Sequence, residues 1–366
     1  MTIVILGLSI TSSWGNGHAT TYRALVRALA DGGHHVLFLE RNAPWYAENR
    51  DLPVPPYCRT QLYEGLDHLQ SAFIDEIRRA DLVIVGSYVP EGIEVGDLVL
   101  RHATGVTAFY DIDTPVTLAR IDRGVDYLTA RQIAAYDLYL SFTGGPTLDL
   151  LSERYAARHA RPLYCSVDAH TYRPDAGRTP TFDLGYLGTY SDDRQPVLDS
   201  LMLQAAARWP NGRFVIAGPQ YPATIVWPPN VQRTQHLAPD HHRGFYTSLR
   251  FTLNVTRRDM VRAGYSPSVR LFEAAACGTP IISDEWPGIG EFFTPGEEIL
   301  LSEGATRTLK YLRTIPEAER LEIGMRARRR VLREHTSAHR ASELEKYVQE
   351  VRRAPVTQAA LERTAS

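Results

Sequence analysis

The sequence contains few cysteines, no excess of charge of either sign and no long apolar run. Its three cysteines, Cys58, Cys165 and Cys277, lie far apart and none has the Cys-x-x-Cys spacing, which disfavours a disulfide framework or a zinc site and fits a reducing compartment. The formal net charge of −2 lacks the basic excess that nucleic-acid-binding proteins usually show. No stretch approaches the roughly 18 apolar residues that a membrane-spanning helix needs. We therefore expect a soluble, cytoplasmic protein that does not bind nucleic acid.

The chain is long enough for two domains, and its composition supports a core in each. It has 366 residues, of which 44% are hydrophobic and 22% charged, as is ordinary for globular proteins. The residues from Met1 to Gly7 are mostly apolar, with no basic segment and no cleavage signal. This run is expected to be the first strand of a sheet rather than a signal peptide.

The first part of the chain alternates between apolar strands and helical segments. The run 2–8 is β-branched and apolar, the loop 9–17 consists mostly of small residues, and 18–30 has apolar side chains at helical spacing. Further strands are expected at 35–40, 82–86, 106–110 and 138–142. This pattern predicts an N-terminal Rossmann-like domain over residues 1–165. The loop does not match Gly-x-Gly-x-x-Gly, so it indicates a dinucleotide only weakly.

The alternation starts again after a segment rich in Pro, Asp, Gly and Thr. We predict an interdomain linker at 166–181 and a second Rossmann-like domain at 182–335. Its strands are expected at 182–188, 213–217, 251–255, 280–283 and 298–301. A helix at 336–353 is predicted to pack back on the first domain, and 354–366 is predicted to be a flexible tail. The expected fold class is α/β, with two Rossmann-like domains that face each other across a cleft.

A helix followed by a buried strand is expected at 266–283. Ser266 can cap the first turn, Pro267 suits the first helical position, and the turn Gly278-Thr-Pro280 ends the helix. Such a helix start offers free N–H groups and the positive end of a dipole to an anion such as a diphosphate.

Two charged side chains of this helix are suited to binding a nucleotide. Arg270 and Glu273 are expected on the same face as the helix start. That face would carry anion donors, a cation and a carboxylate, which suit the phosphates and ribose hydroxyls of a nucleotide. The spacing fits an ordinary amphipathic helix as well, whose core side would comprise Val269, Phe272 and Ala276.

Several segments resemble the group 1 glycosyltransferases of the GT-B class. The stretch 167–174, VDAHTYRP, is similar to the segment with which these enzymes leave their first domain. The stretch 271–282, LFEAAACGTPII, is similar to their donor-site helix and strand. The stretch 257–293, the loop 13–19 and the motif 111–115, DIDTP, resemble the branch named after the spore maturation protein CgeB.

The resemblance implies that the C-terminal domain binds a nucleotide sugar and that the N-terminal domain binds an acceptor. Glu273 matches the carboxylate that hydrogen-bonds the nucleotide ribose in relatives, with the helix start at 266–268 facing the diphosphate or the sugar. Retaining relatives carry a second glutamate at the position that Tyr265 occupies here. The resemblance also implies a metal-independent reaction without a cofactor, in which a helix start and cations stabilise the leaving diphosphate. A UDP- or dTDP-sugar is the favoured donor.

Strand ends and helix starts supply the other binding candidates. Gly188 follows a strand and permits close approach to a phosphate, and Arg194 could neutralise a diphosphate or lie in solvent on a turn. The predicted donor-binding residues are Gly188, Thr189, Tyr190, Arg194, Gly218, Pro219, His236, Leu237, Arg257, Ser266, Ser268, Val269, Arg270 and Glu273. The predicted acceptor-binding residues are Trp14, Asn16 and Gly17.

His18, Asp111 and Asp113 are the predicted catalytic residues. His18 starts the first helix and could deprotonate an acceptor hydroxyl, because the pKa of histidine lies near working pH; it could also be a structural hydrogen bonder. Asp111 and Asp113 close a strand and are expected to point to the same side, so either could be the base. Asp-x-Asp is also the metal-diphosphate motif of the GT-A class, which the two Rossmann-like halves disfavour. A base at this place favours inversion of the anomeric configuration.

These observations predict a hexosyltransferase-like enzyme that moves a sugar from a nucleoside diphosphate sugar to a hydroxyl. The acceptor is a glycan, a small molecule or a protein. A nucleotide-sugar 2-epimerase of the same architecture and a non-catalytic sugar-nucleotide-binding protein remain alternatives. Release of the nucleotide only when an acceptor is present would distinguish transfer from epimerisation, whereas loss of nucleotide binding in Glu273→Ala without sugar consumption by any acceptor would favour the binding protein.

Overall fold

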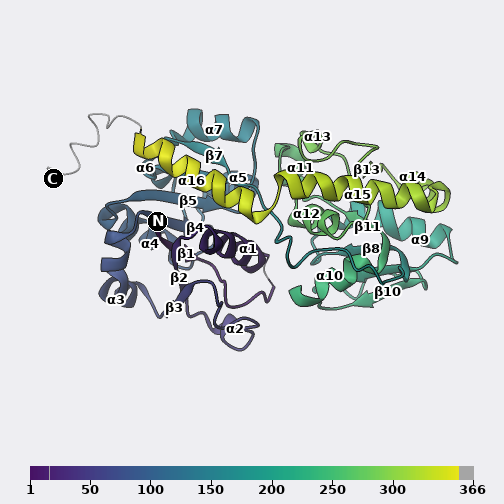
Figure 1. The fold of residues 1–366 in the computed structure, drawn as a ribbon, viewed down its shortest axis with the longest axis horizontal. Helices are drawn as coiled ribbons and strands as arrows, with labels where there is room; N and C mark the ends of the chain where they lie inside the picture. Colours follow the sequence, from purple (N-terminus) through teal and green to yellow (C-terminus); the bar gives the residue numbers. More distant parts are fainter. Residues whose placement is uncertain (16, 354–366) are drawn as a thin grey trace.

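The computed structural model describes residues 1–15 and 17–353. Asn16, predicted to bind the acceptor, and the predicted flexible tail 354–366 lie outside the described residues. The chain forms two α/β domains side by side along the long axis of the molecule (Figure 1). This confirms the fold class expected from the sequence.

The N-terminal domain is built on a seven-stranded parallel sheet in the order β3-β2-β1-β4-β5-β6-β7. Its strands are β1 (Thr2–Gly7), β2 (His35–Arg41), β3 (Arg59–Tyr63), β4 (Leu82–Gly86), β5 (Val106–Asp111), β6 (Leu138–Ser141) and β7 (Ala160–Pro162). The order reverses between β1 and β4. Parallel α/β sheets bind ligands at the carboxyl ends of their strands beside such a reversal.

Helices cover both faces of this sheet because the strand residues are apolar on both sides. The helices are α1 (His18–Asp31), α2 (Pro44–Ala47), α3 (Leu66–Arg79), α4 (Gly92–His102), α5 (Thr114–Arg120), α6 (Ala130–Ala135) and α7 (Pro146–Tyr155), with a 3₁₀ turn at Ile121–Arg123. In β1, Ile3 and Ile5 pack in the cluster that contains α1, whereas Val4 and Leu6 pack in the cluster that contains α3 and α4. Such two-sided burial is typical of parallel strands.

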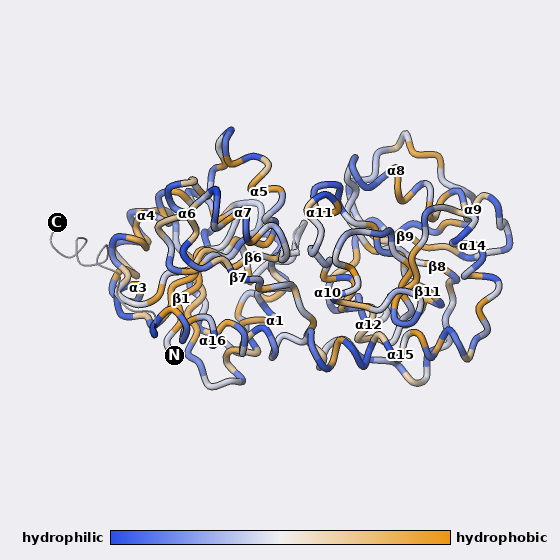
Figure 2. The backbone as a smooth tube through the Cα atoms, turned by 90° about the horizontal axis from the view of Figure 1, so that it is seen from above, coloured by the Kyte–Doolittle hydropathy of each residue, from blue (hydrophilic) through white to orange (hydrophobic). Residues whose placement is uncertain are grey.

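The C-terminal domain has a six-stranded parallel sheet in the order β10-β9-β8-β11-β12-β13. Its strands are β8 (Phe182–Leu187), β9 (Phe214–Ala217), β10 (Val231–Thr234), β11 (Leu249–Asn254), β12 (Ile281–Ser283) and β13 (Leu300–Leu301). The order reverses between β8 and β11. Figure 2 shows apolar segments inside each domain and hydrophilic segments at the rims.

The helices of the second half lie around this sheet and extend back to the first. They are α8 (Gln195–Leu198), α9 (Gln204–Arg208), α10 (Pro239–Thr247), α11 (Arg258–Ala263), α12 (Val269–Ala276), α13 (Ile289–Phe292), α14 (Ala305–Thr314), α15 (Glu317–Glu334) and α16 (Ser337–Arg353). A π-helical turn, Asp199–Leu203, joins α8 to α9. None of the helices in the described ranges has the length and hydropathy that a membrane crossing requires.

The chain passes between the domains twice, and the two crossings lie side by side. The Val167 N–H donates to the His335 carbonyl at 3.3 Å, and the Ser337 N–H donates to the Val167 carbonyl at 3.0 Å. After this point α16 packs against α1 and β5 of the N-terminal domain (Figure 1). The chain therefore returns from the C-terminal domain and ends with α16 packed on the N-terminal domain.

The start of α12 differs from the sequence expectation. Ser268, not Ser266, is the N-cap residue, and the helix begins at Val269. The hydroxyl of Ser266 accepts from Thr143 at 2.9 Å, and the Pro267 carbonyl accepts from the Cys165 thiol at 3.1 Å. These contacts with the N-terminal domain hold 266–267 outside the helix, so Ser266 does not share a helical face with the residues of α12.

Candidate functional site

Two adjoining cavities lie between the domains, at the carboxyl ends of the strands. We call them the strand-end cavity, of about 220 Å³, and the His18 cavity, of about 200 Å³. The strand-end cavity is lined by Ser13, Gly15, Gly17, Thr20, Leu187, Gly188, Thr189, Arg194, Ala217, Gly218, Pro219, His236, Leu237, Pro239, His242, Val269, Arg270 and Glu273. The His18 cavity is lined by Gly17, His18, Thr21, Ile112, Asp113, Phe142, Cys165, Arg194, Thr256, Arg257, Met260, Ser266, Pro267, Ser268, Val269 and Arg270. They share Gly17, Arg194, Val269 and Arg270.

The structure brings most of the predicted donor-binding residues together around these cavities. Tyr190 is an exception, because its ring packs on Tyr221 at 5.6 Å and its hydroxyl donates to Asp192 at 2.6 Å. Trp14 does not line either cavity, but its ring lies 5.2 Å from that of His236. This contact joins the N-terminal domain to the C-terminal domain at the edge of the strand-end cavity.

The wall of the strand-end cavity beside β8 and β9 is main chain, because glycine follows each strand. A Cβ on Gly218 would lie 2.0 Å from the Gly188 carbonyl oxygen, and a Cβ on Gly188 would lie 2.6 Å from the Tyr186 hydroxyl. The Gly188 N–H donates to the Ala217 carbonyl at 2.9 Å. The two strand ends can approach this closely only without side chains, which leaves backbone groups facing the cavity.

Two half-buried arginine side chains lie where the cavities meet. Arg194 donates to the Thr189 carbonyl at 2.6 Å, and Arg270, in the first turn of α12, donates to the Val255 carbonyl at 3.4 Å. The Nε of each arginine has no hydrogen-bond partner, and neither guanidinium forms an ion pair with any residue of the described part. Burial lowers the pKa of Arg194, and the nearby charges of Arg270 and Arg257 lower it further. This positive charge is available to an anion that enters the cavity.

Glu273 contributes a carboxylate to the other side of the strand-end cavity. It lies on α12 one turn after Arg270 and is 2% exposed. Its Oε2 accepts from the Tyr246 hydroxyl at 3.0 Å and lies 3.8 Å from Nδ1 of His242. These partners fix the carboxylate in place, where it can accept a hydrogen bond from a ligand hydroxyl.

His18 is the first residue of α1 and lines the His18 cavity. Its side chain is 8% exposed, its ring packs edge-on against Tyr88 at 5.4 Å, and its Nδ1 has no hydrogen-bond partner within 1–15 and 17–353. Burial lowers the pKa of His18, and the charge of Asp113 opposes this effect in part. The imidazole is therefore neutral near pH 7, as a proton acceptor must be.

The two aspartates after β5 have different surroundings, contrary to the expectation that they point to the same side. Asp111 is fully buried and accepts from the hydroxyls of Tyr139 at 2.5 Å and Thr117 at 2.9 Å. Burial raises the pKa of Asp111 to about 7 although these hydrogen bonds lower it. Asp113 precedes α5, lines the His18 cavity and accepts from the Tyr88 hydroxyl at 3.2 Å. The chain turns between them, so only Asp113 faces the cavity.

Tyr265 occupies the position at which a second glutamate was expected from retaining relatives. Its φ is +48°, its N–H donates to the Pro287 carbonyl at 2.7 Å, and its carbonyl accepts from the Gly144 N–H at 3.0 Å. A Cβ on Gly145 or Gly288 would lie 2.3 Å or 2.5 Å from its ring. The ring therefore lies between a glycine of each domain, and it does not line either cavity.

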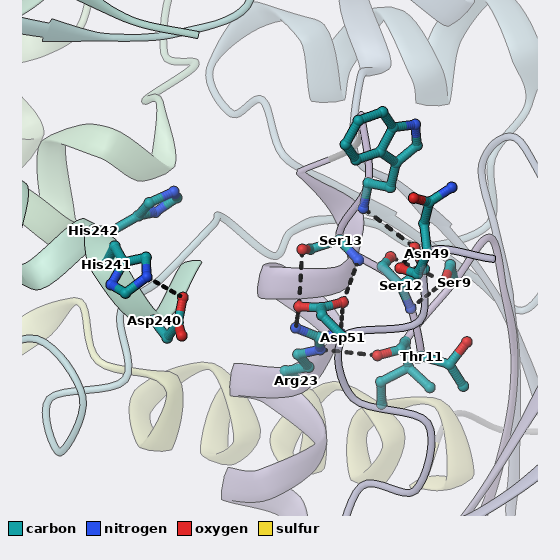
Figure 3. A network of polar contacts seen from close by, with 12 residues as sticks. Ser9, Thr11, Ser12, Ser13, Arg23, Asn49, Asp51, Asp240, His241 and His242 are labelled. Carbon is teal, nitrogen blue, oxygen red and sulfur yellow. Dashed lines mark hydrogen bonds and ion pairs between the residues drawn. The ribbon is translucent and has the colours of Figure 1, made fainter. Parts of the chain in front are cut away.

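A polar network that the sequence did not reveal holds the loop between β1 and α1 (Figure 3). Asp51 accepts from the Ser13 N–H and hydroxyl at 2.8 and 2.9 Å and pairs with Arg23 at 2.8 Å. Burial raises the pKa of Asp51, but Arg23 and Ser13 outweigh it and hold the pKa at about 2. Buried Glu40 accepts from the N–H groups of Ile10 and Thr11 at 2.7 and 3.0 Å. The loop is thus fixed where it faces α10 across the strand-end cavity.

The described residues do not contain three or more His, Cys, Asp or Glu side chains arranged to hold a metal ion. In particular, Asp111 and Asp113 do not converge, because Asp111 is enclosed by Tyr139 and Thr117. The cations at the site are the arginines.

Known proteins resemble this chain in sequence over part of its length and in fold over nearly all of it. Residues 194–346 match the protein family described as "Glycosyl transferase-like". No curated protein sequence matches the chain. Solved structures match almost all of it: sucrose-phosphate synthase from Thermosynechococcus elongatus has a TM-score of 0.68 at 14% identity, covering 96% of this chain and 99% of that one. An α-glucosyltransferase in complex with UDP has a TM-score of 0.71 at 12% identity, covering 95% and 100%.

A third similar structure is Anabaena HepE in complex with UDP and glucose. Its TM-score is 0.67 at 11% identity, and the match covers 96% of this chain and 100% of that one. The matches extend over both domains, whereas the family match covers α12 and the arginines of the C-terminal domain. The chain therefore has the GT-B fold, and its residues 194–346 are similar to the glycosyl transferase-like family.

Proposed function

We propose that this protein is a glycosyltransferase that moves a sugar from a nucleoside diphosphate sugar to a hydroxyl acceptor. One observation carries the proposal. Arg194 and Arg270 lie half-buried and without ion-pair partners in the described part of the chain, at the junction of two cavities and beside the start of α12, and the Nε of each is buried without a hydrogen-bond partner. A partly desolvated positive cluster of this kind is stabilised by an anion, and a diphosphate would fit between the two cavities.

The nucleotide would bind in the strand-end cavity. Glu273 would accept from a ribose hydroxyl, and main-chain groups near Gly188, Gly218 and Leu237 would contact the base. A UDP- or dTDP-sugar is the favoured donor; two of the similar structures contain UDP. The stretch 257–293, the loop 13–19 and the motif 111–115 support the further proposal that the protein belongs to the CgeB branch. We also propose the domain boundaries expected from the sequence, with an N-terminal domain that binds the acceptor and a C-terminal domain that binds the donor.

Transfer would take place in the His18 cavity. His18 takes the proton of the acceptor hydroxyl while the oxygen of that hydroxyl attacks the anomeric carbon. The bond from that carbon to the diphosphate oxygen breaks, and Arg194, Arg270 and the N–H groups at the start of α12 stabilise the leaving charge. Asp113 stabilises the imidazolium that forms. A single displacement of this kind inverts the anomeric configuration, and it needs no metal ion because the arginines neutralise the leaving group.

The proposal is tested first by ligand binding. In a thermal-shift panel of UDP, GDP, dTDP and CMP and their sugars, at least one nucleoside diphosphate should raise the Tm, because a ligand that binds only the folded state stabilises it by about 2.7 kcal/mol at 100 times its Kd. Its sugar should then release the nucleotide faster when acceptors are added. A protein that none of these ligands stabilises would contradict the proposal, and release without any acceptor would favour the epimerase or a hydrolase.

A further inference from the structure

An ion pair crosses the cleft inside the His18 cavity. Arg257 precedes α11 in the C-terminal domain, and its Nη1 lies 3.8 Å from Oδ2 of Asp113 in the N-terminal domain. The same oxygen accepts from the Tyr88 hydroxyl. The side chains of Arg257 and Asp113 are 37% and 23% exposed, so water screens the pair and it can exchange partners easily. Helices α5 and α11 pack against each other beside it.

Arg257 also belongs to the cationic cluster. It lines the His18 cavity together with Arg194 and Arg270, and its charge acts on Arg194 and on Asp193. A diphosphate at the junction of the cavities would attract Arg257 more strongly than the single, partly hydrated carboxylate of Asp113 does. The two partners of Arg257 therefore compete for it.

The competition bears on the proposed base, because Asp113 lines the same cavity as His18 and accepts from Tyr88, whose ring packs against that of His18. The charge of Asp113 also raises the pKa of His18 against the effect of burial. While Arg257 holds Asp113, part of the negative charge that would stabilise an imidazolium at His18 is neutralised. When Arg257 pairs with a diphosphate instead, the remaining partners of Asp113 are His18 and the Tyr88 hydroxyl. The arrangement can therefore strengthen the base only when the donor is present.

We infer that Arg257 is a positioning residue that couples donor binding to the base: it pairs with Asp113 in the empty cleft and moves to the donor diphosphate when this binds. The inference rests on the proposed function. Arg257 would alternate between two partners, Asp113 and the donor diphosphate. Proton abstraction by His18 would therefore be limited until the donor is bound. The coupling requires no covalent step.

A double-mutant cycle on nucleotide affinity tests the inference. UDP and uridine are titrated by calorimetry into the full-length protein and into Asp113→Asn, Arg257→Met and the double variant. Asp113→Asn should strengthen UDP binding about two- to fivefold, as expected for the loss of a competing, partly exposed ion pair, and should leave uridine unchanged. In the Arg257→Met background the same substitution should change UDP affinity by less than about 1.5-fold.

Other results of this double-mutant cycle would overturn the inference or the proposed function. If Asp113→Asn strengthens UDP binding equally in both backgrounds, Asp113 acts on the diphosphate by its own charge and the inference is wrong. No effect of Asp113→Asn in the wild-type background also overturns it. Arg257→Gln, which also removes the charge, replaces Arg257→Met if that variant unfolds, and Arg257→Lys, which keeps the charge, should retain the effect of Asp113→Asn. If no nucleoside diphosphate binds the wild-type protein at all, it is the proposed function that fails.

Discussion

Replacing His18 by alanine should lower turnover about 10²- to 10⁴-fold, the usual contribution of general base catalysis, and should leave nucleotide affinity within about twofold. The reason is geometric: His18 lines the cavity of the proposed transfer, whereas Glu273 and the main-chain groups proposed to bind the nucleoside line the strand-end cavity. Steady-state rates with the donor identified by the ligand panel, together with calorimetry, measure both quantities. The matched control is His241→Ala on α10, whose imidazole is 70% exposed and lies outside both cavities.

The pH dependence should identify the same group. A base must be unprotonated, and burial lowers the pKa of His18 below its usual value of about 6.5. The acid limb of kcat/KM should therefore lie below pH 6.5. In Asp113→Asn it should move to still lower pH, because the charge that opposes the effect of burial is lost. Wild-type turnover in a folded His18→Ala variant would remove His18 from the base role.

Replacing Glu273 by alanine should weaken nucleotide binding by about 10- to 150-fold, which corresponds to the 1.5–3 kcal/mol of a hydrogen bond to a charged group. Its carboxylate is 2% exposed and is the acidic group of α12 that lines the strand-end cavity. Binding of inorganic pyrophosphate should be unchanged, since Glu273 is proposed to contact the ribose rather than the phosphates. Calorimetric titrations of UDP and pyrophosphate check both statements.

Two controls separate loss of this contact from loss of structure. Tyr246→Phe removes the hydroxyl that donates to Glu273 and should leave most of the UDP affinity, because the carboxylate remains. Glu285→Ala removes an exposed carboxylate after β12 and should have no effect on binding. Unchanged UDP affinity in Glu273→Ala would exclude Glu273 from the nucleotide site.

The sequence was sufficient to predict the two parallel sheets and the C-terminal side of the cleft. Strands such as β4 and β9 are continuous apolar runs, and buried parallel strands have this pattern. Ligand sites of such sheets lie at the strand ends, so the loop at Gly188 and the residues Arg270 and Glu273 could be placed near one another without a structure.

The errors have a common physical cause, which is contact between distant segments. The start of α12 was predicted two residues too early because Thr143 and Cys165, in the other domain, hold Ser266 and Pro267 outside the helix. Asp111 was expected to face the cleft, but Tyr139 encloses it. No local pattern reports such contacts, since they depend on how the two domains meet.

The network around Asp51 could not be predicted from the sequence for the same reason, since it joins distant segments. Arg23 lies on α1 and Asp51 in an irregular segment after α2, and neither belongs to a recognisable motif. Their pairing fixes the loop at Ser13, which lines the strand-end cavity. The role of Glu40 could have been suspected from the sequence, because a charged residue at the end of an apolar strand, here β2, often has a structural or functional contact.

The central claim is that a nucleoside diphosphate binds in the cleft beside α12, and hydrogen–deuterium exchange tests it most directly. Exchange is measured with and without saturating UDP, or with whichever nucleoside diphosphate stabilises the protein most. The proposed contacts predict slower exchange in 187–194, 217–219, 236–242 and 266–273, and little change at the groove between α3 and the start of β2, which is lined by His35, Arg59 and Glu76. Protection confined to that groove, or none in the four cleft segments while the ligand is bound, would contradict the account.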